Sequence, residues 1–171
     1  MRKFAVAKGF EENKVNLPKR ATKYSAGYDF ESAEDITIPS FWKTLMANFL
    51  NGDNLFKPVI VKTGIKAYMK NDEVLFLYPR SSNSIKRFLI MPNSVGVIDS
   101  DYVDNDDNDG SIGVPLWNFG SKPVHIVKGE RIAQGIFTKF YVVDDDDAED
   151  IAKRSGGFGH TGIGGTKDGI L

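Results

Sequence analysis

Carboxylates, hydroxyls, arginines and closely spaced glycines occur together in five short segments of the chain. The segments are AGYD at 26–29, PRSSNS at 79–84, NSVGVIDSDY at 93–102, GERIAQ at 129–134 and GGFGHTG at 156–162. Carboxylates hold metal ions and accept protons from water. Arginine and serine side chains bind phosphate, and glycines let backbone amides approach it closely. Together the segments predict one site for a nucleoside triphosphate, whereas each alone is weak evidence.

The segment at 93–102 offers three side chains with different chemistry. Asp99 follows an apolar run that ends at Ile98, so we expect it at a strand end, where a carboxylate can accept a proton from water. The ring of Tyr102 can pack on a sugar, and the amide of Asn93 can bond to the edge of a pyrimidine, because it carries a donor and an acceptor. Each also has a purely structural explanation, as a turn aspartate, a core or edge-strand tyrosine and a turn asparagine.

Phosphate-binding groups are expected in two other segments. The planar fork of Arg80 can bridge phosphate oxygens, and Ser81 and Ser82 add short donors where a helical turn can begin. A capped helix start with a surface arginine explains the same residues. In GERIAQ, strand alternation would turn Ile132 and Gln134 to one face, so the amide would have apolar neighbours. A buried amide needs a partner, which a phosphate, a metal-bound water or a backbone group would supply.

The C-terminal tail is rich in glycine, with seven between Ser155 and Gly169. Such a segment cannot build a core of its own, so it is either a disordered end or an arm that a ligand orders. Phe158 is better explained by stacking on a base than by core packing, and the amide of Gly159 can approach a phosphate. His160 can donate to a phosphate or face solvent. A Walker-type phosphate loop is excluded because no GK[ST] follows.

The elements that must position these groups are mostly strands. Short apolar or β-branched runs are separated by Gly, Pro, Asn and Asp, which is typical of a β-sandwich or barrel. The expected strands are Val59–Val61, Val74–Tyr78, Val95–Ile98, Ile112–Leu116, Val124–Val127, Ile132–Phe137 and Phe140–Val143. Within Ile112–Leu116 the apolar residues alternate with Gly113 and Pro115, which predicts one buried face.

One helix interrupts the strands. Apolar residues recur at helical spacing over Phe41–Leu50, with Ser40 placed to cap the start and Gly52 the end. We expect an inserted amphipathic helix whose apolar face packs on the barrel, and binding of a protein partner is the alternative. The acidic runs Asp104–Gly110 and Asp144–Asp147 are expected to be a solvated loop and part of a linker. The first run lacks the glutamate that closes a calcium loop.

Composition limits the class of protein. With 171 residues, 41% of them hydrophobic, the chain is expected to form one domain with an ample core. The absence of cysteine excludes disulfides, thiolate metal sites and a cysteine nucleophile. A net charge of −1 predicts no general attraction to nucleic acid or anionic membranes. No apolar run suits a signal peptide or a bilayer span, so we expect a soluble, cytoplasmic protein.

In this order, the five segments resemble those of the trimeric dUTPases, the dUTP nucleotidohydrolases, and GVIDSDY, RIAQ and GGFGHTG are the closest parts. The resemblance covers residues 26–162. It implies an all-β, jelly-roll-like β-barrel over residues 1–151, with the insertion at about 40–56, and a C-terminal arm over 152–171 that closes over an active site. It also implies a homotrimer whose sites each draw on more than one subunit. The size and the insertion suit a bacteriophage or bacterial member.

The resemblance further implies a role for each candidate residue. dUTP would be hydrolysed to dUMP and pyrophosphate with Mg²⁺, which Asp29 would hold through water. Asp99 would orient the water that attacks the α-phosphorus. Tyr102 would pack under the deoxyribose, while Asn93 would recognise uracil and Phe158 would stack on it. The residues expected to contact the phosphates are Arg80, Ser81, Ser82, Gln134, Gly159, His160 and either Lys153 or Arg154.

Departures from the family pattern leave alternatives. Many members carry an arginine five residues before the lid aromatic, where this chain has Lys153, with Arg154 one position later. The acidic stretch after Tyr102 lengthens a hairpin, and we expect it to point away from the triphosphate. A dCTP deaminase of the same fold is one alternative, although residues 93–102 lack the glutamate which that chemistry requires. A regulatory module that binds a protein through the inserted helix and the acidic loop is another.

Overall fold

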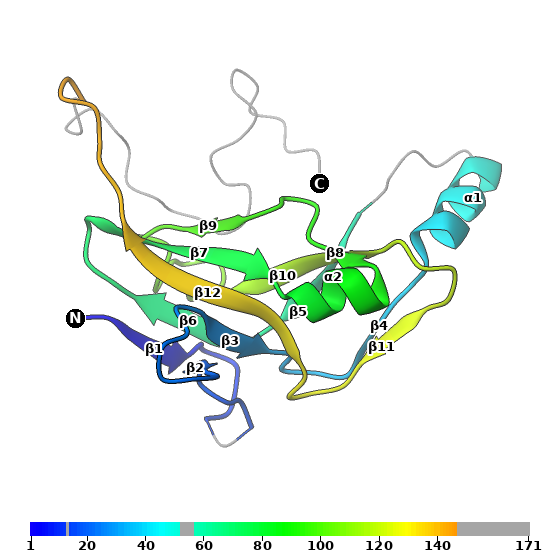
Figure 1. Ribbon diagram of the computed structural model, residues 1–171, viewed down its shortest axis with the longest axis horizontal. Helices are drawn as coiled ribbons and strands as arrows, with labels where there is room; N and C mark the ends of the chain where they lie inside the picture. Colours follow the sequence, from blue (N-terminus) through cyan, green and yellow to red (C-terminus); the bar gives the residue numbers. More distant parts are fainter. Residues whose placement is uncertain (13, 52–56, 147–171) are drawn as a thin grey trace.

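The computed structural model describes residues 1–12, 14–51 and 57–146, and short strands dominate this part of the chain (Figure 1). The strands are β1 Lys3–Val6, β2 Lys19–Arg20, β3 Tyr28–Glu31, β4 Ile36–Ile38, β5 Val59–Lys62, β6 Ile65–Tyr68, β7 Glu73–Pro79, β8 Leu89–Ile90, β9 Gly96–Ile98, β10 Gly113–Asn118, β11 Val124–Ile126 and β12 Arg131–Lys139. The helices are α1 Phe41–Asn51 and α2 Ser81–Arg87. The predicted all-β architecture with one inserted helix is confirmed.

The described strands form four separate sheets. Their orders are β1-β6, β5-β10-β8, β11-β4 and β2-β3-β12-β7-β9. The largest sheet centres on the antiparallel pair β12 and β7, which runs from Ala133 opposite Pro79 to Lys139 opposite Glu73. The expected closure into a barrel is wrong for the described chain, because the edge strands β2 and β9 of this sheet each pair on one side only.

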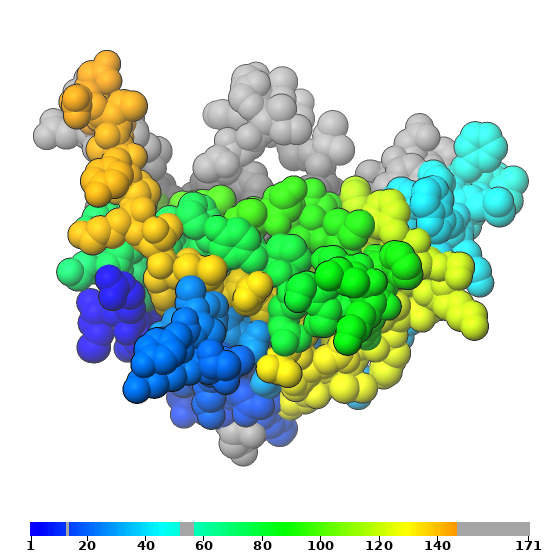
Figure 2. Space-filling model, viewed as in Figure 1, coloured from blue at the N-terminus to red at the C-terminus, as the bar shows by residue number. Residues whose placement is uncertain are grey.

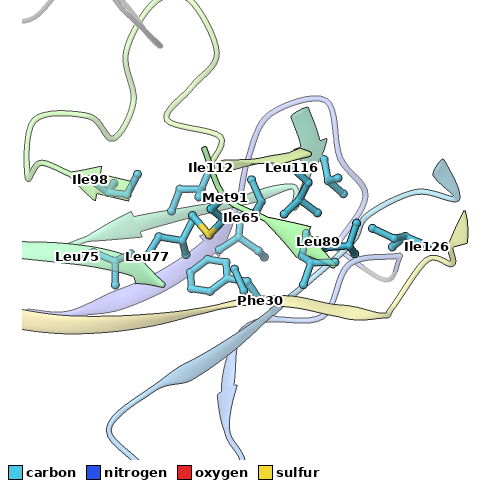
Figure 3. Packing of buried hydrophobic residues seen from close by; sticks show 14 of the residues in the cluster. Phe30, Ile65, Leu75, Leu77, Leu89, Met91, Ile98, Ile112, Leu116 and Ile126 are labelled. Atoms are coloured by element: carbon cyan, nitrogen blue, oxygen red, sulfur yellow. The ribbon is translucent and has the colours of Figure 1, made fainter. Parts of the chain in front are cut away.

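The hydrophobic core lies between the sheets and receives side chains from all four of them. Figure 3 shows Phe30 of β3 and Leu77 of β7 pointing toward Met91 and toward Ile65 of β6. Phe30 and Leu75 are 0% exposed. Burial of each such side chain contributes roughly 1.5–3 kcal/mol to stability. The core therefore fixes the five-stranded sheet, whose opposite face carries candidate site residues.

Strand β10 departs from the predicted alternation. Four consecutive residues, Gly113 to Leu116, are buried, so both faces of the strand are covered rather than one. The strand pairs with β5 on one side and with β8 on the other. Buried and exposed residues alternate along a strand only where one face of the sheet meets water. Both faces of this central strand are covered, so the alternation is absent.

The strand predicted at Phe140–Val143 is not formed. Strand β12 ends at Lys139, and the next four residues are 43–95% exposed. Lys139 lies opposite Glu73, the first residue of β7. Beyond that point β7 offers no further residues to pair with, so the apolar run leaves the sheet (Figure 1).

Helix α1 forms where its spacing predicts it, but most of its apolar face is exposed. At its start, Phe41 stacks on Phe119 with ring centroids 4.6 Å apart, and Trp42 Nε1 donates to the Phe119 carbonyl at 2.9 Å. Three apolar side chains farther along are 67–80% exposed: Met46, Phe49 and Leu50. Figure 2 shows α1 projecting from the edge of the molecule. The expected packing on the β core therefore holds for the first turn only.

Ser40 does not cap α1 with its side chain, contrary to the prediction. Its hydroxyl donates to the Gly120 carbonyl at 2.7 Å, and its own carbonyl accepts the first helical bond from Thr44 N at 3.0 Å. The side chain is buried against the β10–β11 connection, so it is turned away from the helix amides. The expected end at Gly52 lies outside the described residues.

Neither helix in the described ranges is long and apolar enough to cross a membrane.

Candidate active site

Asp29 is held between two arginines on the outward face of β3. Its neighbour Phe30 points into the core, so Asp29 points to the other face. Arg80 Nε donates to Asp29 Oδ1 at 3.0 Å, and Arg131 Nη1 donates to Oδ2 at 3.1 Å. The Asp29 side chain is only 15% exposed. Two guanidinium groups and one carboxylate leave this cluster with one excess positive charge, which suits a polyanionic ligand.

Gln134 is the nearest neighbour of Asp29 on β12. It lies directly opposite Asp29 in the pairing with β3, and opposite Tyr78 in the pairing with β7. Its Nε2 donates to the Pro79 carbonyl at 3.3 Å. The amide oxygen occupies space that Gly27 leaves empty, since a β-carbon there would stand 2.8 Å away. The AGYD and GERIAQ segments are thus brought together, as the sequence predicts.

A β-bulge interrupts the pairing of β12 with β3. Arg131 lies opposite Glu31, and Ala133 lies opposite Phe30, so two steps on β12 match one on β3. Ile132 is the additional residue. Ile132 and Ala133 are 1% and 0% exposed, so both point into the core.

The bulge corrects the predicted orientation of this strand. Regular alternation would place Ile132 and Gln134 on one face, but the structure buries Ile132 and turns Gln134 outward. Arg131, three residues before Gln134, also faces outward and reaches Asp29. Bulges often redirect side chains beside active sites. This bulge places both Arg131 and Gln134 on the outward face, whereas regular alternation would place only Gln134 there.

Helix α2 begins at Ser81, as the PRSSNS segment predicts. Arg80 precedes it with an extended backbone, φ −84° and ψ 136°, and its carbonyl accepts from Asn83 N at 3.0 Å. Ser81 is exposed and Ser82 half-buried. Asn83 is 4% exposed, and its Nδ2 donates to the carbonyl of Ile132 at 3.0 Å. This bond ties α2 to the bulge, a role that sequence reasoning missed because Asn83 lies among other polar residues.

Asp99 follows β9 directly, as predicted, and is half-buried. Its carbonyl accepts from Tyr102 N at 3.1 Å, which closes a tight turn. Tyr102 is 5% exposed and belongs to the core cluster. Its hydroxyl donates to the Ser111 carbonyl at 3.2 Å and accepts from Asn108 Nδ2 at 2.9 Å. The core explanation for Tyr102 is confirmed, and its packing against a sugar stays a prediction.

Asn93 is exposed in the turn that leads into β9. Ser94, next to it, has a left-handed φ of 59° and donates its N–H to the Met91 carbonyl at 3.0 Å. The structure therefore confirms Asn93 as a turn residue. Recognition of uracil by its side chain stays a prediction.

Within one chain Asp99 lies far from the Asp29 cluster. Ile98 pairs with Leu75 of β7, whereas Gln134 pairs with Tyr78 of the same strand. Strand rise and spacing place the backbones of Asp99 and Asp29 roughly 20 Å apart. Within one chain, the two carboxylates therefore do not belong to one cluster.

The acidic loop after Tyr102 is tied to β6. Lys66 Nζ lies 2.5 Å from Asp104 Oδ1 and 2.8 Å from Asp109 Oδ2. Burial lowers the pKa of Lys66, but the hydrogen bonds to these carboxylates outweigh it and raise the pKa overall. Lys66, with Lys8 N, also lowers the pKa of Asp109. Part of the loop's charge is therefore neutralised locally.

Five predicted site residues lie outside the described residues: Lys153, Arg154, Phe158, Gly159 and His160.

Comparisons with known proteins point to one family. The family model for dUTPase matches residues 13–162. The deoxyuridine 5'-triphosphate nucleotidohydrolase of Lactococcus lactis is 43% identical over 162 residues, which cover 95% of this chain and 98% of that protein. The protein of the same name from Shewanella piezotolerans is 34% identical over 152 residues, which cover 85% and 86% of the two chains.

The solved structures agree with the sequence relatives. The crystal structure of dUTPase from Streptococcus mutans is similar with a TM-score of 0.71 and 38% identity, over 82% of this chain and 98% of that one. This similarity confirms the predicted jelly-roll-like β architecture.

Proposed function

Because the chain belongs to the dUTPase family, we propose that it hydrolyses dUTP to dUMP and pyrophosphate by attack of water on the α-phosphorus. The observation that carries the proposal is the family match over residues 13–162, a range that contains all five segments predicted to bind a triphosphate. The relatives are named nucleotidohydrolases, which favours hydrolysis over the deamination of dCTP.

Arg80 is the central phosphate-binding group in this proposal. Its Nε bonds to Asp29 and its Nη1 to the carbonyl of Arg131 at 3.4 Å. A guanidinium has five N–H donors, so others remain for phosphate oxygens. The hydroxyls of Ser81 and Ser82 follow at the start of α2, and the Gln134 amide lies on the same side of the sheet as Asp29.

The residues present fit a magnesium ion that is bound mainly by substrate. Mg²⁺ in nucleotide enzymes usually keeps several waters and takes one or two carboxylates plus phosphate oxygens. Asp29 supplies one carboxylate, and the described residues contain no group of three or more His, Cys, Asp or Glu that would form a full protein cage. Asp29 would hold the ion through water, and the ion would neutralise charge on the phosphates.

Asp99 is the proposed general base. It is a half-buried carboxylate at the end of β9, and it would orient the attacking water and accept its proton. No covalent intermediate is required, so the chain needs no cysteine or serine nucleophile. The hydrolysis then depends on alignment of water and on charge stabilisation at the phosphates.

Nucleoside recognition falls to the neighbouring turn. Asn93 would pair with the uracil edge through its amide. Tyr102, whose hydroxyl makes two hydrogen bonds, would pack its fixed ring under the deoxyribose and disfavour a 2′-hydroxyl. Rigidity of the ring supports this role, because a specificity contact must resist displacement.

The site is completed by more than one subunit of a homotrimer. The roughly 20 Å between the backbones of Asp29 and Asp99 supports this assembly, because only Asp99 from another chain would approach the phosphates held by Arg80. The C-terminal arm would close the site, with Phe158 on uracil. Gly159, His160 and either Lys153 or Arg154 would contact the phosphates.

Pyrophosphate release from purified protein tests the proposed function. We expect rapid, Mg²⁺-dependent release from dUTP and little release from dTTP, dCTP or UTP. EDTA should abolish the activity. Equal turnover of dTTP and dUTP would contradict the uracil pocket, and ammonia release from dCTP would establish the deaminase alternative.

A further inference from the structure

Arg131 belongs to the GERIAQ segment, yet it is not among the residues predicted to contact phosphate. Its side chain is 49% exposed, and its Nη1 donates to Asp29 Oδ2 at 3.1 Å. The two residues are 102 positions apart in the sequence. Arg131 is thus directed at a carboxylate of the site.

The bulge at Ile132 makes this contact possible. In a regular strand, Arg131 would share a face with Ala133, which is 0% exposed in the core. The additional residue reverses the alternation and turns the arginine outward, opposite Glu31. A bulge disrupts the hydrogen-bond ladder, so the orientation of Arg131 is obtained at some loss of regular pairing.

Arg131 also contacts Arg80 through its backbone. Arg80 Nη1 donates to the Arg131 carbonyl at 3.4 Å, while Arg80 Nε donates to Asp29. The three residues therefore form a closed set in which each one contacts the other two. Loss of the Arg131 side chain would leave Asp29 held from one side only, free to rotate toward Arg80.

We propose that Arg131 is a positioning residue that acts through Asp29: it fixes the carboxylate beside Gln134 and so leaves donors of Arg80 directed at the triphosphate. The inference rests on the proposed function and extends it. Arg131 does not touch substrate in this role. Its contribution is the orientation of Asp29, the carboxylate proposed to hold the cation that accompanies the nucleotide.

A double-mutant cycle tests whether Arg131 acts through Asp29. The variants are Arg131→Met, Asp29→Asn and the two combined, and the probe is a dUTP analogue with nitrogen in place of the α,β-bridging oxygen. Isothermal titration with Mg²⁺ gives Kd for each. We expect Arg131→Met alone to weaken binding by about tenfold, since couplings between contacting residues commonly reach that size. In the Asp29→Asn background the same change should have almost no effect.

Two results would overturn the inference. One is an equal loss of affinity in both backgrounds, which would mean that Arg131 contacts phosphate itself. The other is unchanged affinity of Arg131→Met with Asp29 intact. If the wild-type protein neither binds the analogue nor hydrolyses dUTP, the proposed function fails, and this inference fails with it.

Arg2 provides a matched control for general loss of an ion pair. Its side chain is 53% exposed and lies 2.5 Å from Glu73, which pairs with Lys139 at the far end of β12 from Gln134. We expect Arg2→Met to lower Tm without changing Kd for the analogue. Equal loss of affinity in Arg2→Met and Arg131→Met would show a general stability effect and would refute positioning. Arg131→Lys should recover affinity only partly, because an ammonium lacks the planar fork.

Discussion

The amide oxygen of Gln134 lies 2.8 Å from the position that a β-carbon on Gly27 would occupy. A β-carbon at position 27 would therefore displace the flexible end of the Gln134 side chain. Gln134 in turn lies opposite Asp29. The glycine of AGYD thus controls where an amide of GERIAQ can sit.

Gly27→Ala should displace the Gln134 side chain and impair catalysis. We expect kcat/KM for dUTP to fall about 10–100-fold, because small displacements of positioning groups are costly. Steady-state kinetics and thermal melting measure the effect. In a Gln134→Ala background the same substitution should cost little more, and a full additional loss there would contradict the clash.

Asp99→Asn should reduce turnover far more than binding. The amide keeps the shape of the carboxylate but does not accept a proton, and general bases contribute about 10²–10⁴-fold to rate. We expect kcat to fall by that factor, with Kd for the nitrogen-bridged analogue nearly unchanged. An increase in KM with normal kcat would rule out the role of Asp99 as base.

Mixed trimers test whether Asp29 and Asp99 of one site come from different chains. Asp29→Asn and Asp99→Asn subunits would each be nearly inactive alone. After co-refolding in equal amounts, about a quarter of the sites should combine an intact Asp29 with an intact Asp99, if assembly is random. Activity of the mixture that merely equals the mean of the two variants would place both residues on one chain.

Truncation after Asp150 should cripple turnover while leaving the proposed trimer intact. The removed arm carries Phe158, and its closure would exclude bulk water and complete the site. Sedimentation and steady-state kinetics on the same sample report both properties. Full activity of the truncated protein would disprove the arm's role as a lid.

Glu73 should make stability depend on pH. Its side chain is 1% exposed, and a hydrogen bond from Arg2 lowers its pKa below the ordinary 4.5. A carboxyl group whose pKa is lower in the folded than in the unfolded state stabilises the fold at pH values above its unfolded-state pKa. This stabilisation is lost as the pH falls through the folded-state pKa. Glu73→Gln should therefore lower Tm at neutral pH. The difference in Tm between wild type and variant should become smaller below about pH 4.5. A difference in Tm that stays constant at acidic pH would exclude this contribution of Glu73 to the pH dependence of stability.

Local signals in the sequence located several site residues correctly. The apolar run before Asp99 placed it at a strand end, and the serines after Arg80 placed the start of α2. Both features depend on residues within a few positions, where turn and capping preferences act directly. Apolar spacing likewise located α1.

The errors concern long-range pairing. The face of Gln134 depends on a bulge formed against β3, a strand about a hundred positions away, and the residues of GERIAQ do not reveal it. Ser40 is a good capping residue, but its hydroxyl donates to the Gly120 carbonyl instead of accepting from a helix amide. Asn83 was overlooked because its importance comes from the carbonyl of Ile132.

The extra residue in β12 shifts the alternation of inward and outward side chains by one position. Inward and outward positions before Ile132 are exchanged relative to those after it, so regular pairing of the same residues, without the bulge, would turn Arg131 into the core. An uncompensated charge there is strongly destabilising. The outward orientation of Arg131 thus depends on the bulge, and a strand of the same sequence that paired without it would bury this charge.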